Sequence, residues 1–156
     1  MELYRAEILT DHRCLLGEGP VWQAETRTLH YTDILGCRLH TLCLDGGSET
    51  TLQLDKPVGC FALRQDGGMI LGMSDGVYLR SPAGELERLS QPVWSPLVRA
   101  NDGKCDPDGR FWCGTSDEVE GAAEGGLYVI APDGRCARLL SGLRCANGLA
   151  FRGDTV

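Results

Sequence analysis

The chain has 156 residues, of which 42% are apolar and 24% charged, as expected for one globular domain with its own core. Its formal net charge of −7 argues against the basic surface that nucleic acids and anionic membranes attract, so we expect neither as a partner. Glycine is frequent, with 21 residues, about twice its usual share, which indicates many turns.

The first ten residues alternate apolar and polar side chains, which predicts a strand from Leu3 to Leu9. The same stretch has neither a basic segment nor a long apolar run, so it is not typical of a signal peptide. No run in the chain approaches the roughly 20 apolar residues of a membrane span. We therefore expect a cytoplasmic protein.

From residue 21 onward the sequence predicts short strands separated by glycine-containing turns, and no segment has helical periodicity. The pair Asp108-Gly109, after Pro107, predicts a type I′ turn, in which both central residues have positive φ. Further strands are predicted at 29–33, 38–44, 51–54, 60–63, 69–73, 77–79, 86–89, 110–113, 127–130, 136–140 and 149–151.

These strands form a repeat that can be aligned on the glycine expected just before each unit's first strand, namely Gly19, Gly59, Gly103 and Gly148. The spacings of 40, 44 and 45 residues, with about four strands per unit, are typical of β-propeller blades, whereas a β-sandwich would not repeat in this way. We therefore predict an all-β fold, with residues 1–156 forming a single partial propeller domain of about three and a half blades. Propellers close with about 4 to 8 blades, so an open edge would favour self-association.

Four polar residues recur at the same phase of this repeat, in the predicted loop before a first strand: Glu18, Arg99, Asn101 and Asn147. Equivalent loops of successive blades meet at one mouth of a propeller, where carboxylate and amide oxygens would suit a hard divalent cation. Taken singly, Glu18 is also explained as a solvated turn charge and Asn147 as half of an Asn-Gly turn. Their joint recurrence favours a shared metal or ligand site.

The cysteines and histidines have no spacing typical of a metal site. The eight cysteines contain no C-x-x-C pair, and without export we expect them to be free, most of them as small buried apolar residues. The three histidines are not clustered, and we expect His30 and His40, which fall in alternating strands, to be structural.

Several motifs together carry a family resemblance: C-L-L-G-E-G-P-V-W at 14–22, L-H-Y-T-D-I at 29–34, R-A-N-D-G-K-C-D-P-D-G-R-F-W-C-G-T at 99–115 and C-A-N-G-L-A-F at 145–151. In these motifs the chain resembles the N-terminal half of the regucalcin/gluconolactonase family. The resemblance implies a six-bladed β-propeller that hydrolyses sugar lactones with one divalent cation, which could be calcium, zinc, manganese or magnesium.

The resemblance also implies roles for individual residues. It places metal ligands at Glu18 and Asn147 and substrate contacts at Arg99, Asn101 and Glu118. The family's third metal ligand, an aspartate that is also implicated as the general base, falls in the second half of its propeller. We therefore expect no catalytic residue within 1–156, and we expect the chain alone not to hydrolyse lactones at a family-like rate.

Three functional interpretations stay open at this point. The first is a metal-dependent lactonase that opens an aldonolactone ring. The second is a non-catalytic half-propeller that binds a divalent cation or a partner chain. The third is a truncated fragment with no independent function.

Overall fold

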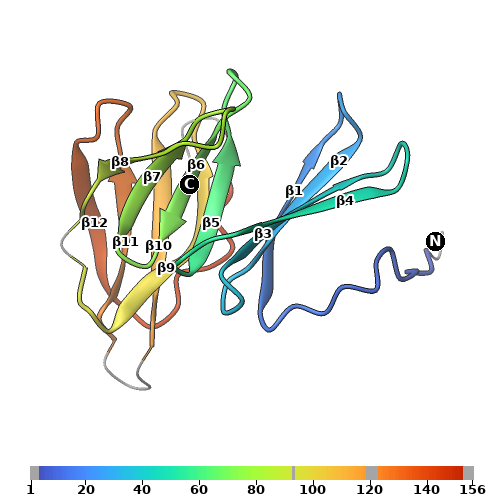
Figure 1. Cartoon of the computed structure of the whole chain (residues 1–156). Helices are drawn as coiled ribbons and strands as arrows, with labels where there is room; N and C mark the ends of the chain where they lie inside the picture. Colours follow the sequence, from blue (N-terminus) through green and yellow to red (C-terminus); the bar gives the residue numbers. More distant parts are fainter. Residues whose placement is uncertain (1–3, 93, 119–122, 153–156) are drawn as a thin grey trace.

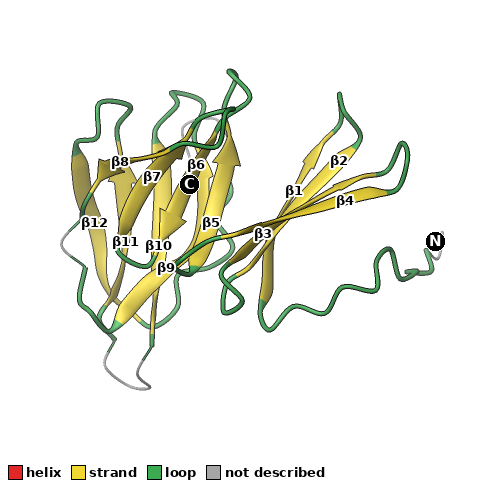
Figure 2. Cartoon of the chain, in the orientation of Figure 1, coloured by secondary structure: helices red, strands yellow, loops and turns green. Residues whose placement is uncertain are grey.

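The computed structural model describes residues 4–92, 94–118 and 123–152, which form three four-stranded antiparallel sheets and, within those ranges, no helix (Figures 1 and 2). The predicted all-β fold is therefore confirmed, and each sheet is one blade of the predicted repeat. Among these residues, no helix is long and apolar enough to span a membrane.

Each sheet is a meander in which the four strands pair in chain order. The first sheet consists of β1 (Gly17–Gln23), β2 (Thr28–Asp33), β3 (Arg38–Cys43) and β4 (Ser48–Gln53). The second consists of β5 (Val58–Leu63), β6 (Met69–Met73), β7 (Gly76–Arg80) and β8 (Leu86–Ser90). The third consists of β9 (Val98–Cys105), β10 (Phe111–Asp117), β11 (Gly125–Ile130) and β12 (Cys136–Leu143).

The hairpin between β9 and β10 corrects the predicted turn type. Gly109 donates its N–H to the carbonyl of Asp106 (3.0 Å), and Asp106 donates to the carbonyl of Arg110 (2.9 Å). Gly109 has a φ of 77°, whereas Asp108 is not among the described residues with positive φ. The loop is therefore a type I turn closed by a left-handed glycine, because Pro107 favours the first central position of a type I turn. The same pattern of backbone hydrogen bonds closes the turns at Gly67, Gly84 and Gly134.

The first strand of every blade contains a β-bulge, which corrects the predicted position of the repeat glycines. The pairing of β1 with β2 shifts between Glu18 and Val21, and that of β5 with β6 shifts across Gly59. The pairing of β9 with β10 shifts where Asn101 and Asp102 stand opposite a single residue. The first three aligned glycines thus lie inside the first strands rather than before them, because an isolated glycine in a strand marks a bulge or a close backbone approach.

Gly59 shows what this close approach requires. A Cβ at Gly59 would lie 1.9 Å from the carbonyl oxygen of Ala100 on β9. Only glycine therefore lets β5 and β9 come this close, and the inner strands of the second and third blades lie side by side (Figure 1).

The hydrophobic core is divided between the two blade interfaces. Between the first and second sheets, the hydroxyl of buried Thr32 donates a 2.6 Å hydrogen bond to the carbonyl of Val58 and so links β2 to β5. The buried side chains of this interface are Leu39, Leu54, Val58, Phe61, Met69, Leu71 and Met73. Those of the interface between the second and third sheets are Cys60, Ile70, Val77, Ala100, Phe111, Cys113, Tyr128 and Ile130.

The strand predicted before β1, from Leu3 to Leu9, is wrong. Leu3 lies outside the described residues, and residues 4–16 form no strand. Ile8 and Leu9 are 89% and 57% exposed. Alternation alone does not make a strand, because the backbone groups also need a neighbouring strand to pair with. The segment is held to the first sheet by side chains instead: Thr10 donates a 3.1 Å hydrogen bond to Glu49 on β4.

The eight cysteines are all free, as expected, but the expectation that most are buried is wrong. Only Cys60 and Cys113 are buried, with their sulfur atoms 3.8 Å apart between the second and third blades. Cys136 and Cys145 are exposed, and the other four are half-buried. The exposed pair lies on β12 and in the segment after it, at the outer side of the third blade, where no further sheet of the described chain covers them.

Candidate metal and substrate site

Glu18 lies within β1, directly before the bulge, and not in a loop as predicted. It stands opposite Thr32 in the pairing of β1 with β2 and is half-buried. The two residues that follow, Gly19 and Pro20, are the bulge, so the pairing resumes only at Val21. A bulge re-aims the side chains next to it, which is why bulges are frequent at binding sites.

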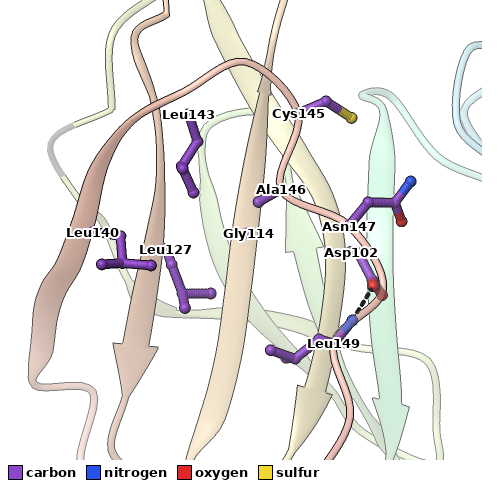
Figure 3. Close-up of a pocket in the computed structure, with 9 residues that line it drawn as sticks. All are labelled: Asp102, Gly114, Leu127, Leu140, Leu143, Cys145, Ala146, Asn147 and Leu149. Carbon is purple, nitrogen blue, oxygen red and sulfur yellow. Dashed lines mark hydrogen bonds between the residues drawn. The ribbon is translucent and has the colours of Figure 1, made fainter. Parts of the chain in front are cut away.

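The segment that follows β12 brings Asn147 close to the third blade. Ala146 donates its N–H to the carbonyl of Thr115 (3.2 Å), and Cys145 forms an isolated bridge with Ser116. Leu149 donates its N–H to a carboxylate oxygen of Asp102 at 2.9 Å (Figure 3). Residues 144–152 therefore run back along β9 and β10, and within them the predicted strand at 149–151 does not form.

One cavity of about 270 Å³ is lined by both Glu18 and Asn147, the two residues that the sequence analysis named as metal ligands. Its wall also contains Asp102 from β9. The remaining residues that line it are Gly19, Pro20, Val21, Cys60, Phe61, Gly103, Lys104, Gly148 and Leu149. Two carboxylates and an amide around one cavity are hard oxygen donors, so their chemistry fits a divalent cation.

Cys60 lines the same cavity, but its thiol is paired with that of Cys113. The hydrogen bond with Cys113, together with burial, raises the pKa of the Cys60 thiol well above its ordinary value. The sulfur is thus engaged with the sulfur of Cys113, 3.8 Å away. The donors of this cavity are its oxygens.

Asn101 is 8% exposed and lies beside the cavity rather than in its wall. Its amide nitrogen donates a 3.0 Å hydrogen bond to the carbonyl of Ala146, and its amide oxygen accepts one of 2.8 Å from Arg99 Nη1. The side chain is thus engaged on both sides. In this arrangement it holds the residue before Asn147 and orients Arg99.

Arg99 and Glu118, both predicted substrate contacts, form an ion pair with 2.7 Å between Nε and Oε1. The Nε–H is not aligned with any acceptor, so this contact is electrostatic rather than a directed hydrogen bond. The Arg99 side chain is 11% exposed and that of Glu118 is 47% exposed. Within the part of the chain that the structure describes, neither side chain lines the cavity that contains Glu18. A chain of contacts nevertheless runs from Glu118 through Arg99 and Asn101 to the segment that carries Asn147.

Asp102 is a site residue that the sequence analysis did not assign. It lines the cavity with Glu18, and it also lines a second cavity of about 290 Å³ on the outer side of the third blade, which Figure 3 shows. Leu127, Leu140 and Leu143 give that second cavity an apolar wall. Its place in the sequence could have indicated this role, because Asp102 directly follows Asn101 in the N-D-G motif. The sequence analysis did not predict the bulge that places Asn101 and Asp102 opposite a single residue of β10.

The chain is similar in sequence to proteins named as sugar lactonases. It is 41% identical over 142 residues to 6-deoxy-6-sulfogluconolactonase of Pseudomonas putida, a match that covers 90% of this chain and 49% of that protein. It is 34% identical over 157 residues to L-arabinolactonase of Azospirillum brasilense, covering 96% and 52%. The chain spans about half the length of the curated relatives it matches.

A solved structure supports the same relationship. The calcium-binding protein regucalcin from Agrobacterium tumefaciens superposes with a TM-score of 0.76 and 30% identity, over 86% of this chain and 46% of that one. The family described as SMP-30/Gluconolactonase/LRE-like region matches residues 16–156. The match covers three propeller blades and both candidate metal ligands, and on this evidence the chain belongs to the SMP-30/gluconolactonase family.

Proposed function

We propose that this chain supplies part of the active site of a divalent-cation-dependent sugar lactonase. The observation that carries the proposal is the cavity shared by Glu18 and Asn147, in a member of a family whose relatives include proteins named as sugar lactonases. An aldonolactone is the substrate class that fits these relatives' names.

The cation would be held by Glu18 and Asn147, with Asp102 at the same cavity wall. A divalent cation bound there would polarise the lactone carbonyl and lower the pKa of an attacking water. Calcium, zinc, manganese and magnesium all accept carboxylate oxygen, so these oxygen donors fit each of the four.

The substrate would be oriented by Arg99, Asn101 and Glu118. Arg99 is held by the Glu118 carboxylate and by the Asn101 amide oxygen, so its guanidinium has a fixed direction. If the lactone ester lies next to this guanidinium, the positive charge of Arg99 would stabilise the negative charge that develops on the carbonyl oxygen. The Asn101 amide would keep the segment carrying Asn147 in register with β9.

A second function is a non-catalytic module that binds a divalent cation or a partner chain. The apolar wall of Leu127, Leu140 and Leu143 on the outer side of the third blade favours it, because an uncovered apolar face promotes association. In this case the chain takes up a cation without turning over a lactone, and it self-associates through its open edge.

The experiment measures cation binding by the 156-residue chain, and cation binding together with lactone hydrolysis by a full-length version of the protein. Calorimetric titration with Ca²⁺ and Mn²⁺ reports uptake, and gluconolactone hydrolysis at constant pH reports turnover. Glu18→Ala is the test variant, and Glu25→Ala, in the exposed turn between β1 and β2, is the matched control.

We expect Glu18→Ala to remove cation binding at this cavity and Glu25→Ala to leave it unchanged. Cation-dependent hydrolysis by the full-length version supports the lactonase, and cation uptake by that version without hydrolysis supports the binding module. The metal assignment is wrong if Glu18→Ala binds cations at this cavity as tightly as the unchanged chain does.

A further inference from the structure

A second group of side chains of the kinds that bind metals lies where residues 10–16 contact the first sheet. The sulfur of Cys14, a carboxylate oxygen of Asp33 and a ring nitrogen of His40 all lie within 4.8 Å of one another. Cys14 comes from the segment before β1, Asp33 from the end of β2 and His40 from β3. None of the three lines the cavity that contains Glu18.

Asp33 brings a buried oxygen with no hydrogen-bond partner into this group. Its side chain is 1% exposed. Oδ1 accepts hydrogen bonds from the backbone N–H groups of Leu16 (2.9 Å) and Gly36 (3.2 Å), whereas Oδ2 accepts none. The nearest cation, Arg38 Nη1, stands 4.0 Å from Oδ2, at the limit of an ion pair. Buried polar atoms in folded proteins nearly always have a partner, so this oxygen is an exception that a bound cation would explain.

His40 contributes a buried nitrogen that also has no hydrogen-bond partner. Its Nδ1 lies 3.0 Å from the hydroxyl of Thr51, whereas Nε2 is buried with no hydrogen-bond partner. The ring is held in place by stacking on Tyr31, with 4.7 Å between centroids. A proton on Nδ1 leaves the Nε2 lone pair free, which is the arrangement that metal-binding histidines adopt when their other nitrogen is hydrogen-bonded.

A neighbouring group, His12, His40 and Glu49, is less suited to hold an ion. The Glu49 carboxylate already accepts hydrogen bonds from Tyr31 (2.8 Å) and Thr10 (3.1 Å), and His12 Nδ1 lies 2.5 Å from it. These contacts satisfy the carboxylate. They also fix the surroundings of His40, so Glu49 supports the inner group from outside rather than competing with it.

We propose that Cys14, Asp33 and His40 form a zinc-binding site that fastens the segment before β1 to the first blade. Sulfur, nitrogen and oxygen donors together are the ligand set of zinc rather than of calcium or magnesium, which take oxygen donors. His40 would bind through Nε2 and Asp33 through Oδ2, the two atoms that have no partner. Cys14 is the residue whose ligation would tie residues 4–16 to β2 and β3.

The first test uses Co²⁺ as a spectroscopic substitute for zinc on the reduced 156-residue chain. Binding through Cys14 gives a sulfur-to-cobalt charge-transfer band that oxygen sites such as the Glu18 cavity do not give. We expect the band in the unchanged chain, in Cys43→Ser and in Glu18→Ala, and its loss in Cys14→Ser. Cys43 is the matched control because it is also half-buried and lies on the first sheet.

Zinc affinity is measured by competition with a chelating dye. Losing a residue that only hydrogen-bonds to a metal ligand lowers metal affinity roughly 10- to 100-fold. Cys14 is a proposed direct ligand, so zinc affinity in Cys14→Ser should fall by at least that much. A band that persists in Cys14→Ser, or that disappears equally in Cys43→Ser, overturns the proposal. So does the absence of a band in the unchanged chain.

A second measurement needs no variant and so does not depend on the folding of Cys14→Ser. Alkylation of each cysteine is followed by mass spectrometry with and without one equivalent of Zn²⁺. We expect zinc to slow the alkylation of Cys14 at least tenfold and to leave that of Cys43 unchanged. Equal rates at Cys14 with and without zinc refute the site.

Discussion

Replacing Asp102 tests whether it positions the segment carrying Asn147 or binds the cation itself. Its carboxylate accepts a 2.9 Å hydrogen bond from the backbone N–H of Leu149, two residues after Asn147. A hydrogen bond to a charged group contributes about 1.5–3 kcal/mol, and a neutral one about 0.5–1.5 kcal/mol. Because Asp102 is only half-buried, we take the lower end, about 1.5 kcal/mol.

This energy predicts the size of the effect. In Asp102→Ala the segment after β12 should open about tenfold more often, since about 1.4 kcal/mol corresponds to a factor of ten. Asp102→Asn keeps an acceptor oxygen and should show a smaller effect, of about three- to fivefold. Amide hydrogen exchange of Leu149, followed by NMR, measures both. Asp108→Ala, which changes an exposed carboxylate in the β9–β10 turn, is the control.

Cation affinity then separates the two roles. If Asp102 only positions the segment, Asp102→Asn should bind the cation more tightly than Asp102→Ala, in the same order as the exchange rates. If Asp102 is a direct ligand, both variants should lose most of the affinity. An unchanged exchange rate of Leu149 in Asp102→Ala would refute the reasoning, because the hydrogen bond would then contribute nothing to holding the segment.

Three further changes test the blades, each by urea unfolding. Thr32→Val removes the buried hydrogen bond to the Val58 carbonyl on β5 and should cost about 1–3 kcal/mol. Thr50→Val, at an exposed position on β4, should change stability by less than about 0.5 kcal/mol. Equal effects of the two changes would contradict the link between β2 and β5. Gly59→Ala should cost about 1–3 kcal/mol or more, since its Cβ would overlap the β9 backbone; a near-neutral result would contradict the close approach of β5 and β9. Burial raises the pKa of Asp106, but hydrogen bonds from the Trp112 and Arg110 side chains and the Arg110 backbone outweigh it, and the folded pKa is lowered. The stability from this carboxylate is therefore present above the unfolded pKa of about 3.9 and is lost as the pH falls through the folded value. Asp106→Asn should lower the free energy of unfolding near neutral pH and make it depend less on pH in acid.

The blade repeat could be predicted from sequence because its turns are set by local chemistry. Glycine is needed wherever a hairpin loop ends in a left-handed residue, as at Gly109, and the chain repeats that requirement in each of the last two blades. The strand from residues 69 to 73 was predicted with its observed bounds, since the glycine turn at Gly67 precedes it and the Asp75-Gly76 pair follows it. The turn type itself was wrong because Pro107 decides it and was not weighed against the Asp-Gly pair.

The candidate site was predicted only in part, because two of its features depend on residues far apart in the chain. Glu18 and Asn147 share a cavity, as their common repeat phase indicated. The grouping of Cys14, Asp33 and His40 has no signature in spacing, since it forms only when residues 10–16 fold back over β2 and β3. Periodicity describes one segment at a time and does not predict such packing.

The bulges explain why the site residues lie within strands and still reach a common cavity. In a regular strand, neighbouring residues point to opposite faces of the sheet, so Asn101 and Asp102 would be separated by the sheet. The bulge in β9 places both residues opposite a single residue of β10. Asn101 can then hold the carbonyl of Ala146 while Asp102 holds the N–H of Leu149, one on each side of Asn147. The position of this candidate ligand therefore depends on an irregularity in the inner strand.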